Sequence, residues 1–172
     1  MERFLVIYIG DSANVIPRIK REHCSGNVEA SALRKHVARE MGYKIRKEKR
    51  TTSNSYRTRI DLPDPRVGEQ QISNYIQSGH WKYVLCKSTD EARDFQWYAI
   101  HKLNPLLNKD RKPWNSTKSE RYQFLLEQLS KSVPRNCSEL RRLDSGPGIY
   151  VLYHPRPPSE NTSKQKHIEQ FE

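Results

Sequence analysis

The sequence predicts an α+β fold: a small, mostly antiparallel sheet of about three strands, flanked by helices. Apolar, β-branched segments of strand length lie near both ends of the chain and once between them. The segments that separate them carry apolar residues at helical spacing. With 172 residues, of which 34% are hydrophobic, the chain favours one domain with a modest core.

The first 60 residues predict one strand and two helices. Residues 3–10 form an apolar run that stops at a glycine, which is typical of a buried strand. Residues 15–24 follow turn-forming residues and predict a helix. Residues 31–41 carry apolar side chains at helical spacing before a glycine, and we expect a second helix there. A basic, Ser- and Thr-rich insertion occupies residues 43–60.

The rest of the chain, from residue 69 on, predicts three helices and two strands. Residues 69–78 fit a short helix, and residues 81–86 fit a strand. Residues 89–103 have the spacing of an amphipathic helix, and so do residues 120–129. Residues 146–153 begin with glycine and continue as an apolar strand.

We expect one domain over residues 1–155, with a helical connector at residues 115–140. Residues 156–172 are Pro-rich and then polar, which predicts a disordered tail. The apolar start of the chain lacks the basic region and cleavage site of a signal peptide. No apolar run approaches the roughly 20 residues that a spanning helix needs. These features favour a cytoplasmic protein.

The three cysteines, Cys24, Cys86 and Cys137, are scattered along the chain. None belongs to a CxxC pair or to a Cys/His cluster with zinc-ligand spacing, so structural zinc is not expected. Their odd number and low frequency fit a reducing cytoplasm.

The charge balance points to a polyanionic partner. Lys and Arg number 31 against 20 Asp and Glu, which gives a net charge of +11. The isoelectric point is near 9.7 and the mean hydropathy is −0.95. Nucleic acid is the leading candidate. A membrane surface is the rival, but no basic helix with a strong apolar face supports it.

Tyr8 to Gly10, followed by Arg18, is the segment richest in possible chemistry. A strand that ends in glycine brings the tyrosine to the edge of the sheet, and the next helix can place an arginine beside it. Tyrosine can orient or deprotonate a water molecule, and arginine can hold a phosphate through two hydrogen bonds. On spacing alone, a buried strand followed by a solvated arginine is the commoner arrangement.

Three further segments follow along the chain: Gly26-Asn27, residues 31–35, and the sequence Leu-Asn-Pro-Leu-Leu-Asn at residues 103–108, where a predicted helix ends. Together with Tyr8-Ile-Gly10 and Arg18, they resemble the GIY-YIG nuclease family. The resemblance covers most of residues 3–114. It implies an endonuclease that hydrolyses DNA phosphodiester bonds with one Mg²⁺ or Mn²⁺ ion.

The first strand of that family, Gly-Ile-Tyr, is missing ahead of Tyr8. The sequence Pro147-Gly-Ile-Tyr150 occurs instead near the end of the chain. We interpret this as a circular permutation in which the late strand pairs with residues 4–10. Two alternatives are a strand exchanged with a partner chain and an accidental match.

The resemblance implies a role for each matching residue. Tyr8 and Tyr150 would be the paired tyrosines, one of which orients or deprotonates the attacking water. Arg18 would stabilise charge on the phosphate. His23, one residue later than the commonest spacing, would be an accessory base or a tyrosine partner. Asn108 would orient the site loop or contact phosphate.

The family's single metal-binding glutamate falls on Gln96, counted back from residues 105 and 108. A neutral amide keeps the shape but loses the charge that attracts the ion. Three explanations remain open: a substitution made to leave bound DNA uncut, a natural binding-only descendant, or a carboxylate supplied from elsewhere. The isosteric change favours the first. Glu91 and Asp94 are nearby but belong to other faces of the same helix.

Basic residues outside the motif are the expected DNA contacts, and Trp114 could stack on a base of a single strand. These candidates are Arg46, Lys47, Lys49, Arg50, Arg57, Arg59, Lys109 and Arg111. A restriction-type enzyme is the first expectation, since the basic insertion could read a duplex, and a palindrome-cutting enzyme would be a homodimer. The alternatives are a repair or single-strand-specific nuclease and an inactive DNA-binding module. An RNA-directed protein is supported only by the charge.

Overall fold

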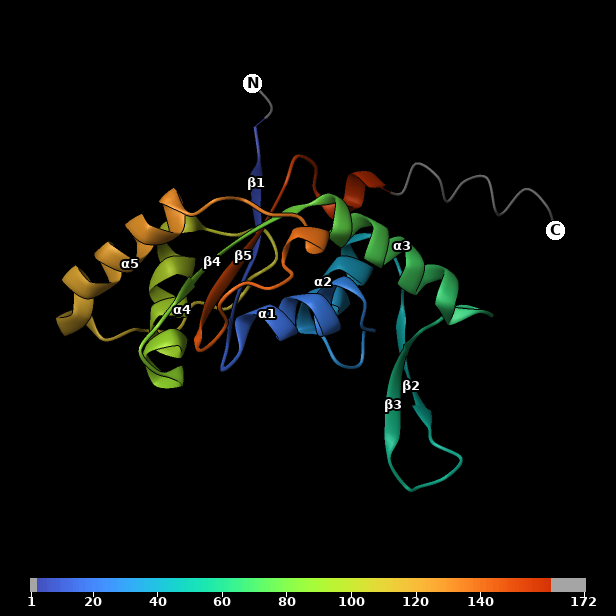
Figure 1. Ribbon diagram of the computed structural model, residues 1–172. Coiled ribbons are helices and arrows are strands. Elements are labelled where there is room, and N and C mark those ends of the chain that lie inside the picture. Colours follow the sequence, from blue (N-terminus) through green and yellow to red (C-terminus); the bar gives the residue numbers. More distant parts are fainter. Residues whose placement is uncertain (1–2, 162–172) are drawn as a thin grey trace.

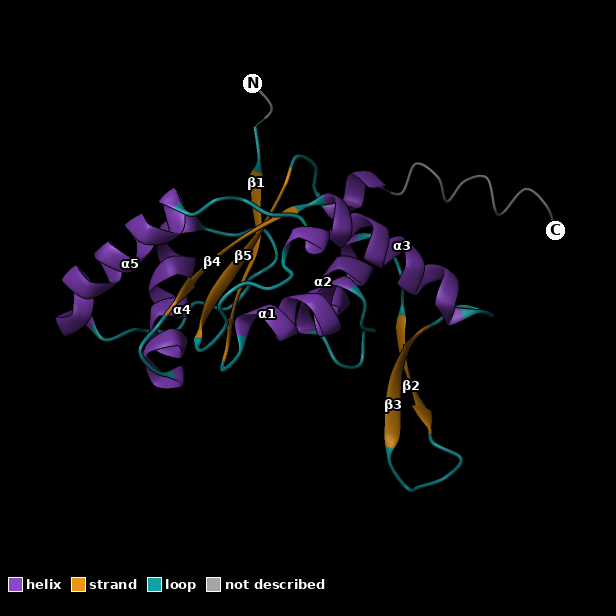
Figure 2. Cartoon of the chain, in the orientation of Figure 1, coloured by secondary structure: helices purple, strands orange, loops and turns teal. Residues whose placement is uncertain are grey.

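A three-stranded antiparallel sheet with helices on both faces forms the body of the molecule (Figures 1 and 2). The computed structural model describes residues 3–161. In spatial order the strands are β1 (Leu5–Ser12), β5 (Gly148–His154) and β4 (His80–Leu85). The α+β class and the small antiparallel sheet expected from the sequence are therefore confirmed.

The central strand of this sheet comes from the far end of the described chain. β5 pairs with β1 on one side and with β4 on the other. All of its residues except Tyr153 are buried, which explains why its sequence is a continuous apolar run. The register places Gly10 opposite Tyr150 and Tyr8 opposite Leu152. The two strands that carry the motif are therefore neighbours within one chain.

Two groups of helices cover opposite faces of the sheet (Figure 1). On the face that carries Ile7 and Leu152 lie α1 (Val15–Pro17), a π-helix (Arg18–Cys24), α2 (Ala32–Glu40) and α3 (Pro65–Ser78). On the face that carries Ile9 and Val151 lie α4 (Thr89–Leu103) and α5 (Ser119–Lys131). Two short 3-10 helices, Ser116–Lys118 and Cys137–Glu139, lie before and after α5.

Two helices differ from their sequence-based boundaries for identifiable reasons. The helix expected over residues 15–24 is α-helical for one turn and then widens into a π-helix. α3 begins at Pro65 instead of residue 69, because the Asp64 side chain accepts a hydrogen bond from the Arg66 backbone N–H. Proline in the first turn after such a cap is a common helix start.

The basic insertion folds into a two-stranded antiparallel hairpin that projects from the body (Figure 1). Its strands are β2 (Ile45–Lys49) and β3 (Tyr56–Ile60). Ile60 is buried and Ile45 is half-buried against the core at the base of the hairpin. Beyond them the residues are mostly polar, so the sequence lacks the apolar alternation that usually marks a strand.

The packing around α4 and α3 bears on two expectations, the stacking of Trp114 on a base and the disorder of the tail that starts at residue 156. Trp114 packs edge-on against Tyr98, with ring centroids 4.7 Å apart, which does not support stacking of Trp114 on a base. The Tyr75 hydroxyl donates a hydrogen bond to the Arg156 carbonyl, so the start of the expected tail packs on α3. The rest of that tail, residues 162–172, lies outside the described residues. Within residues 3–161, no helix is long and apolar enough to cross a membrane.

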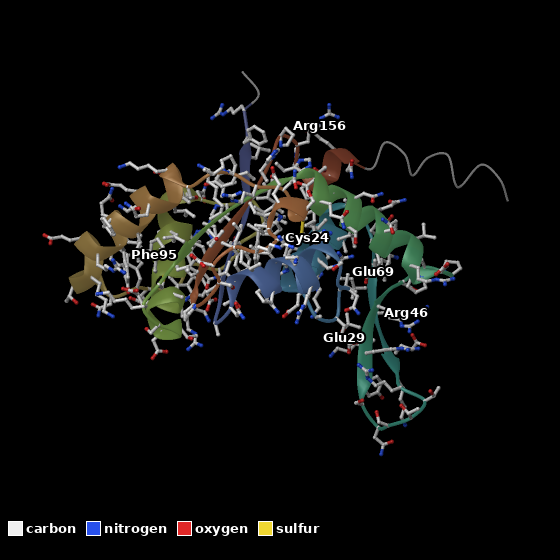
Figure 3. The ribbon with its side chains drawn as sticks, in the orientation of Figure 1. Cys24, Glu29, Arg46, Glu69, Phe95 and Arg156 are labelled. Atoms are coloured by element: carbon white, nitrogen blue, oxygen red, sulfur yellow. A yellow bond between two sulfur atoms is a disulfide. The ribbon has the colours of Figure 1, made fainter. Side chains whose placement is uncertain are left out.

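A disulfide joins Cys24, at the end of the π-helix, to Cys137, 113 residues later (Figure 3). The scattered positions of the cysteines gave no indication of this bond. It ties the segment that leads into β5 to the helix that carries Arg18 and His23. Cys86 remains a free thiol, and burial raises its pKa to about 12.

Reduction of the Cys24–Cys137 disulfide is expected to lower the free energy of unfolding by about 2–5 kcal/mol, because the bond closes a long loop in the unfolded chain. Urea unfolding with and without dithiothreitol measures this difference, and Cys24→Ser combined with Cys137→Ser should reproduce it. Cys86→Ser is the matched control and should leave stability and the effect of the reductant unchanged. A reductant effect that persisted in the double variant would contradict the assignment.

Candidate active site

Gly10 provides the space in which the ring of Tyr150 lies. The two residues are opposite each other on β1 and β5. A Cβ atom at position 10 would overlap with the hydroxyl and the ring of Tyr150. A bulge in β1 between Val6 and Tyr8 lets Ile7 and Tyr8 pack against the same core. Tyr8 and Tyr150 therefore reach the same face of the sheet.

A buried chain of polar groups runs from Tyr150 through His23 to Ser31. The His23 Nε2 atom lies 2.8 Å from the Tyr150 hydroxyl oxygen, and Nδ1 lies 2.7 Å from Ser31 Oγ. His23 is fully buried and stacks on Trp81, with ring centroids 5.9 Å apart. Ser31 also accepts a hydrogen bond from the Arg34 backbone N–H as the N-cap of α2. Packing and capping together fix the orientation of the imidazole.

The π-helix accounts for the unusual spacing of Arg18 and His23. In an α-helix, residues five apart point in very different directions. A π-helix makes i→i+5 hydrogen bonds, so its turn is wider and residues five apart come closer to the same face. Arg18 and His23 lie within this helix, and Arg18 acts electrostatically on both His23 and Tyr150. The π-helix therefore brings His23 toward the same side as Arg18, although His23 comes one residue later than the commonest spacing.

Burial keeps the acid–base groups of this cluster in their neutral forms. Burial, together with the charges of Arg18 and Arg34, lowers the pKa of His23 to about 3. Burial also raises the pKa of Tyr150 and of Tyr8, while the positive charge of Arg18 opposes both shifts. A neutral histidine has one donor and one acceptor nitrogen, so His23 can donate a hydrogen bond on one side of its ring and accept one on the other.

Arg18 lies at the boundary between this cluster and solvent. Its side chain is 29% exposed and forms an ion pair with Glu22, one turn further along the helix. Its guanidinium also lies 3.5 Å from the Ala30 carbonyl oxygen. A ligand phosphate can therefore reach Arg18 by replacing Glu22, a surface interaction of small net energy.

Arg34 holds the region behind His23 together. Its side chain is fully buried, and it donates hydrogen bonds to the His23 carbonyl, to the Ser73 hydroxyl and to both the carboxylate and the backbone carbonyl of Glu69. The other carboxylate oxygen of Glu69 accepts from the Val28 backbone N–H. This network joins the π-helix, α2 and α3.

Two site residues were not expected from the sequence. The His36 ring on α2 lies 6.4 Å from the Tyr8 ring, and burial lowers its pKa. Asp11 follows Gly10 on β1; burial raises the pKa of its carboxyl group, against the lowering effects of Arg93 and Arg18. Asp11 directly follows the motif glycine, which could have marked it. His36 carries no recognisable sequence signal, because its position depends on how α2 packs.

Asn108 and Gln96 act on the outer edge of β1 through Ile9. The Asn108 carboxamide accepts from the Ile9 N–H at 2.8 Å and donates to the Ile9 carbonyl at 2.9 Å, as a neighbouring strand would. Gln96 Nε2 donates to the same carbonyl at 3.2 Å. Of the two roles expected for Asn108, this geometry supports orientation of the loop.

The groups around Gln96 do not fit a resident divalent cation. Gln96 is 9% exposed and uncharged, and its amide nitrogen is bonded to the Ile9 carbonyl. Asp94 accepts hydrogen bonds from the Tyr122 hydroxyl and the Asn115 backbone, and Glu91 is paired with Arg121. Among residues 3–161, no group of three or more His, Cys, Asp or Glu side chains could hold a metal ion.

Most of the expected DNA-binding arginines are engaged within the protein. Arg46 pairs with Asp61, Arg50 with Glu29, and both Arg57 and Arg59 with Glu48. Lys109 lies 4.0 Å from Glu40, and Arg111 donates to Asn104 and to backbone carbonyls of its own loop. Lys47 and Lys49 have no ion-pair partner within the described part of the chain.

Gly10→Ala is expected to lower the free energy of unfolding by about 1–3 kcal/mol, because the added methyl group overpacks the space of the Tyr150 ring. Urea denaturation measures the loss. Gly146→Ala is the matched control, since a Cβ atom there has nothing within 4 Å. Equal stability of the two variants would contradict the close approach of Tyr150 to Gly10.

The stability of the protein is expected to depend on pH through His23. Its pKa is about 3 when folded and near 6.5 when unfolded, so the unfolded chain binds more protons between these values. The contribution is present above about pH 6.5 and is lost as the pH falls toward about 3, by up to about 1.4 kcal/mol per pH unit. Urea unfolding over this range should show a shallower pH dependence for His23→Gln than for the unaltered protein. Parallel curves would show that His23 titrates normally.

Comparison with known families agrees with this geometry. The family model described as the GIY-YIG catalytic domain matches residues 2–131, about three quarters of the chain. The match includes β1 and the π-helix and ends before β5. No curated protein and no solved structure matches the chain. The family match covers Tyr8, Gly10, Arg18 and Gln96, and the chain belongs to the GIY-YIG catalytic domain family, whose members are nucleases that act on DNA.

Proposed function

We propose that this chain is a restriction-type endonuclease that binds duplex DNA and whose metal-dependent cleavage requires a glutamate at position 96. The observation that carries the proposal is the cluster of Tyr8, Arg18, His23 and Tyr150 on one face of the sheet. A net charge of +11 supports a polyanionic substrate. The projecting basic hairpin supports recognition of a duplex.

Arg18 would bind the scissile phosphate of the DNA, and the tyrosines would act on the attacking water. Arg18 would release Glu22 and bind the non-bridging oxygens of the scissile phosphate, where negative charge develops during attack by water. Tyr150 would orient the water. Its hydroxyl lies 2.8 Å from Nε2 of a neutral His23, and this hydrogen bond would fix the direction in which the tyrosine oxygen faces the water.

Position 96 decides whether a divalent ion can join these residues. Mg²⁺ and Mn²⁺ are hard cations that favour carboxylate and water ligands. We propose that the chain with Gln96 binds DNA and leaves it largely uncut, and that a carboxylate at this position allows Mg²⁺ or Mn²⁺ to bind. The hydrogen bond of 3.2 Å from Gln96 to the Ile9 carbonyl supports this, because it shows that the side chain at position 96 lies beside the motif strand.

The order of the motif supports a circular permutation. β5, from the end of the described chain, pairs with β1 where the family's first motif strand would be expected, and the family match stops before it. A homodimer is the proposed assembly, since cutting both strands of a palindrome needs two sites. The cytoplasm stays the proposed location because DNA is found there, although disulfides are uncommon in that compartment.

Gln96→Glu is expected to create Mg²⁺- or Mn²⁺-dependent cleavage of plasmid DNA, because it supplies the missing carboxylate. Plasmid and single-stranded DNA are incubated with each variant and the products are separated on gels. In the Gln96→Glu background, Arg18→Ala should lower the rate by about 10²–10³-fold, and Tyr8→Phe should also lower it. Gln128→Glu, which adds the same charge at an exposed position on α5, is the control and should not cleave.

Two results would contradict the proposed function. If Gln96→Glu stays folded but inactive on every DNA substrate, the nuclease assignment is wrong and the chain is at most a binding module. If Arg18→Ala and Tyr8→Phe keep the full rate of Gln96→Glu, the site lies elsewhere.

A further inference from the structure

The two faces of the β2–β3 hairpin differ in charge. Side chains alternate between the faces of a strand, so the register of the hairpin defines two sets. The arginine face carries Arg46, Glu48, Arg57 and Arg59. The lysine face carries Lys47, Lys49, Tyr56 and Thr58.

The arginine face is largely neutralised by the protein itself. Glu48 lies 3.0 Å from Arg57 and 3.5 Å from Arg59, and the Arg57 hydrogen bond lowers the pKa of Glu48. Arg46 pairs with Asp61 at 3.1 Å. The hollow on this side mixes both signs of charge, with Glu29 and Glu69 visible in Figure 3. Its charged lining residues are Glu29, Arg50, Arg57, Arg59, Asp64, Arg66 and Glu69.

The lysine face is exposed and leads into a purely basic groove. Lys47 and Lys49 are exposed and, within residues 3–161, have no ion-pair partner. The groove beside them runs between the hairpin and α2. Its charged lining residues are Lys35, Arg39, Lys44, Arg46 and Lys47, and no acidic side chain lines it. Of these, Arg46 reaches the groove from the arginine face and is paired with Asp61.

Helix α2 links this groove to the candidate active site. Lys35 and Arg39 lie on either side of His36 in the sequence of that helix. The His36 ring lies 6.4 Å from the ring of Tyr8. Strand β2 has five residues, and at about 3.3 Å per residue it extends the row of basic residues by roughly 17 Å. This is the length of about five base pairs of duplex DNA.

We propose, on the basis of the proposed function, that the lysine face and the adjoining groove form the track that binds the backbone of duplex DNA next to the scissile phosphate. Lysines bind phosphates as point charges and do not require an exact geometry. Single strands are usually held on several stacking aromatic rings. Among the described residues of this track, Tyr56 is the only aromatic side chain exposed to solvent. A duplex therefore fits the track better than a single strand.

The test compares two double variants that remove equal charge from opposite faces of one hairpin. Lys47→Ala with Lys49→Ala changes the lysine face, and Arg57→Ala with Arg59→Ala changes the arginine face. Fluorescence anisotropy measures binding of the full chain to a labelled duplex over a series of salt concentrations. Circular dichroism confirms that each variant is folded, and Lys47→Arg with Lys49→Arg tests whether charge alone is sufficient.

The lysine pair is expected to reduce the slope of log affinity against log salt by about 1.8, or about 0.9 for each lost phosphate contact. At about 0.1 M salt this corresponds to a loss of affinity of roughly 10–100-fold. The arginine pair should change the slope by less than half as much, and the double arginine replacement should keep it.

Each alternative outcome overturns a defined part of the proposal. The lysine face is not the track if the double arginine-to-alanine variant changes the slope of log affinity against log salt as much as the double lysine-to-alanine variant does, or more. The same holds if the double lysine-to-alanine variant leaves the slope unchanged. Equal affinity for a single strand of the same length overturns the duplex. If the unaltered chain binds neither form of DNA at any salt concentration, the proposed function fails, and the track fails with it.

Discussion

The ion pair between the buried Arg34 and the half-buried Glu69 is the interaction on which the candidate active-site region depends. A charged guanidinium removed from water is stable only when it is paired and its donors are satisfied. Here the donors of Arg34 on α2 bind acceptors on two other helices, the π-helix and α3, and one of them binds the carbonyl of His23. The position of the imidazole is therefore linked to α2 and α3. Loss of the carboxylate would leave the buried guanidinium without its charge partner, which in a fully buried pair costs up to about 3–5 kcal/mol, a large part of the stability of a domain this size.

The pairing of β1 with β5 is the second constraint, and it explains why the site is assembled from distant segments. Tyr150 can lie over β1 only where the facing residue has no side chain, and Gly10 meets this requirement. The ring then reaches His23, which comes from the helix that follows β1. The bulge in β1, Gly10 and the π-helix are each local features, and together they bring residues from near both ends of the described chain into one cluster.

Sequence patterns predicted the elements with strong apolar periodicity and failed where structure depends on packing. The helix over residues 89–103 was predicted with its observed boundaries, because its caps and spacing are local. The motif identified Tyr8, Arg18 and Tyr150, and the structure places these three residues close together. The π-helix could not be predicted, so the offset of His23 was left unexplained. The burial of Arg34 and the Cys24–Cys137 bond also had no sequence signal, since both depend on contacts between elements far apart in the chain.

The order of strands in the sheet has a consequence for how the protein is made. β1 and β4 do not pair with each other; each pairs only with β5. A ribosome produces the chain from its N-terminus, so both outer strands emerge before the strand that joins them. The hydrogen bonds of the sheet, and with them the contact between Tyr150 and His23, have to wait for synthesis to pass residue 154. Until then the growing chain has Arg18, which we propose to bind the phosphate, but lacks Tyr150, so a nascent copy cannot have the complete cluster.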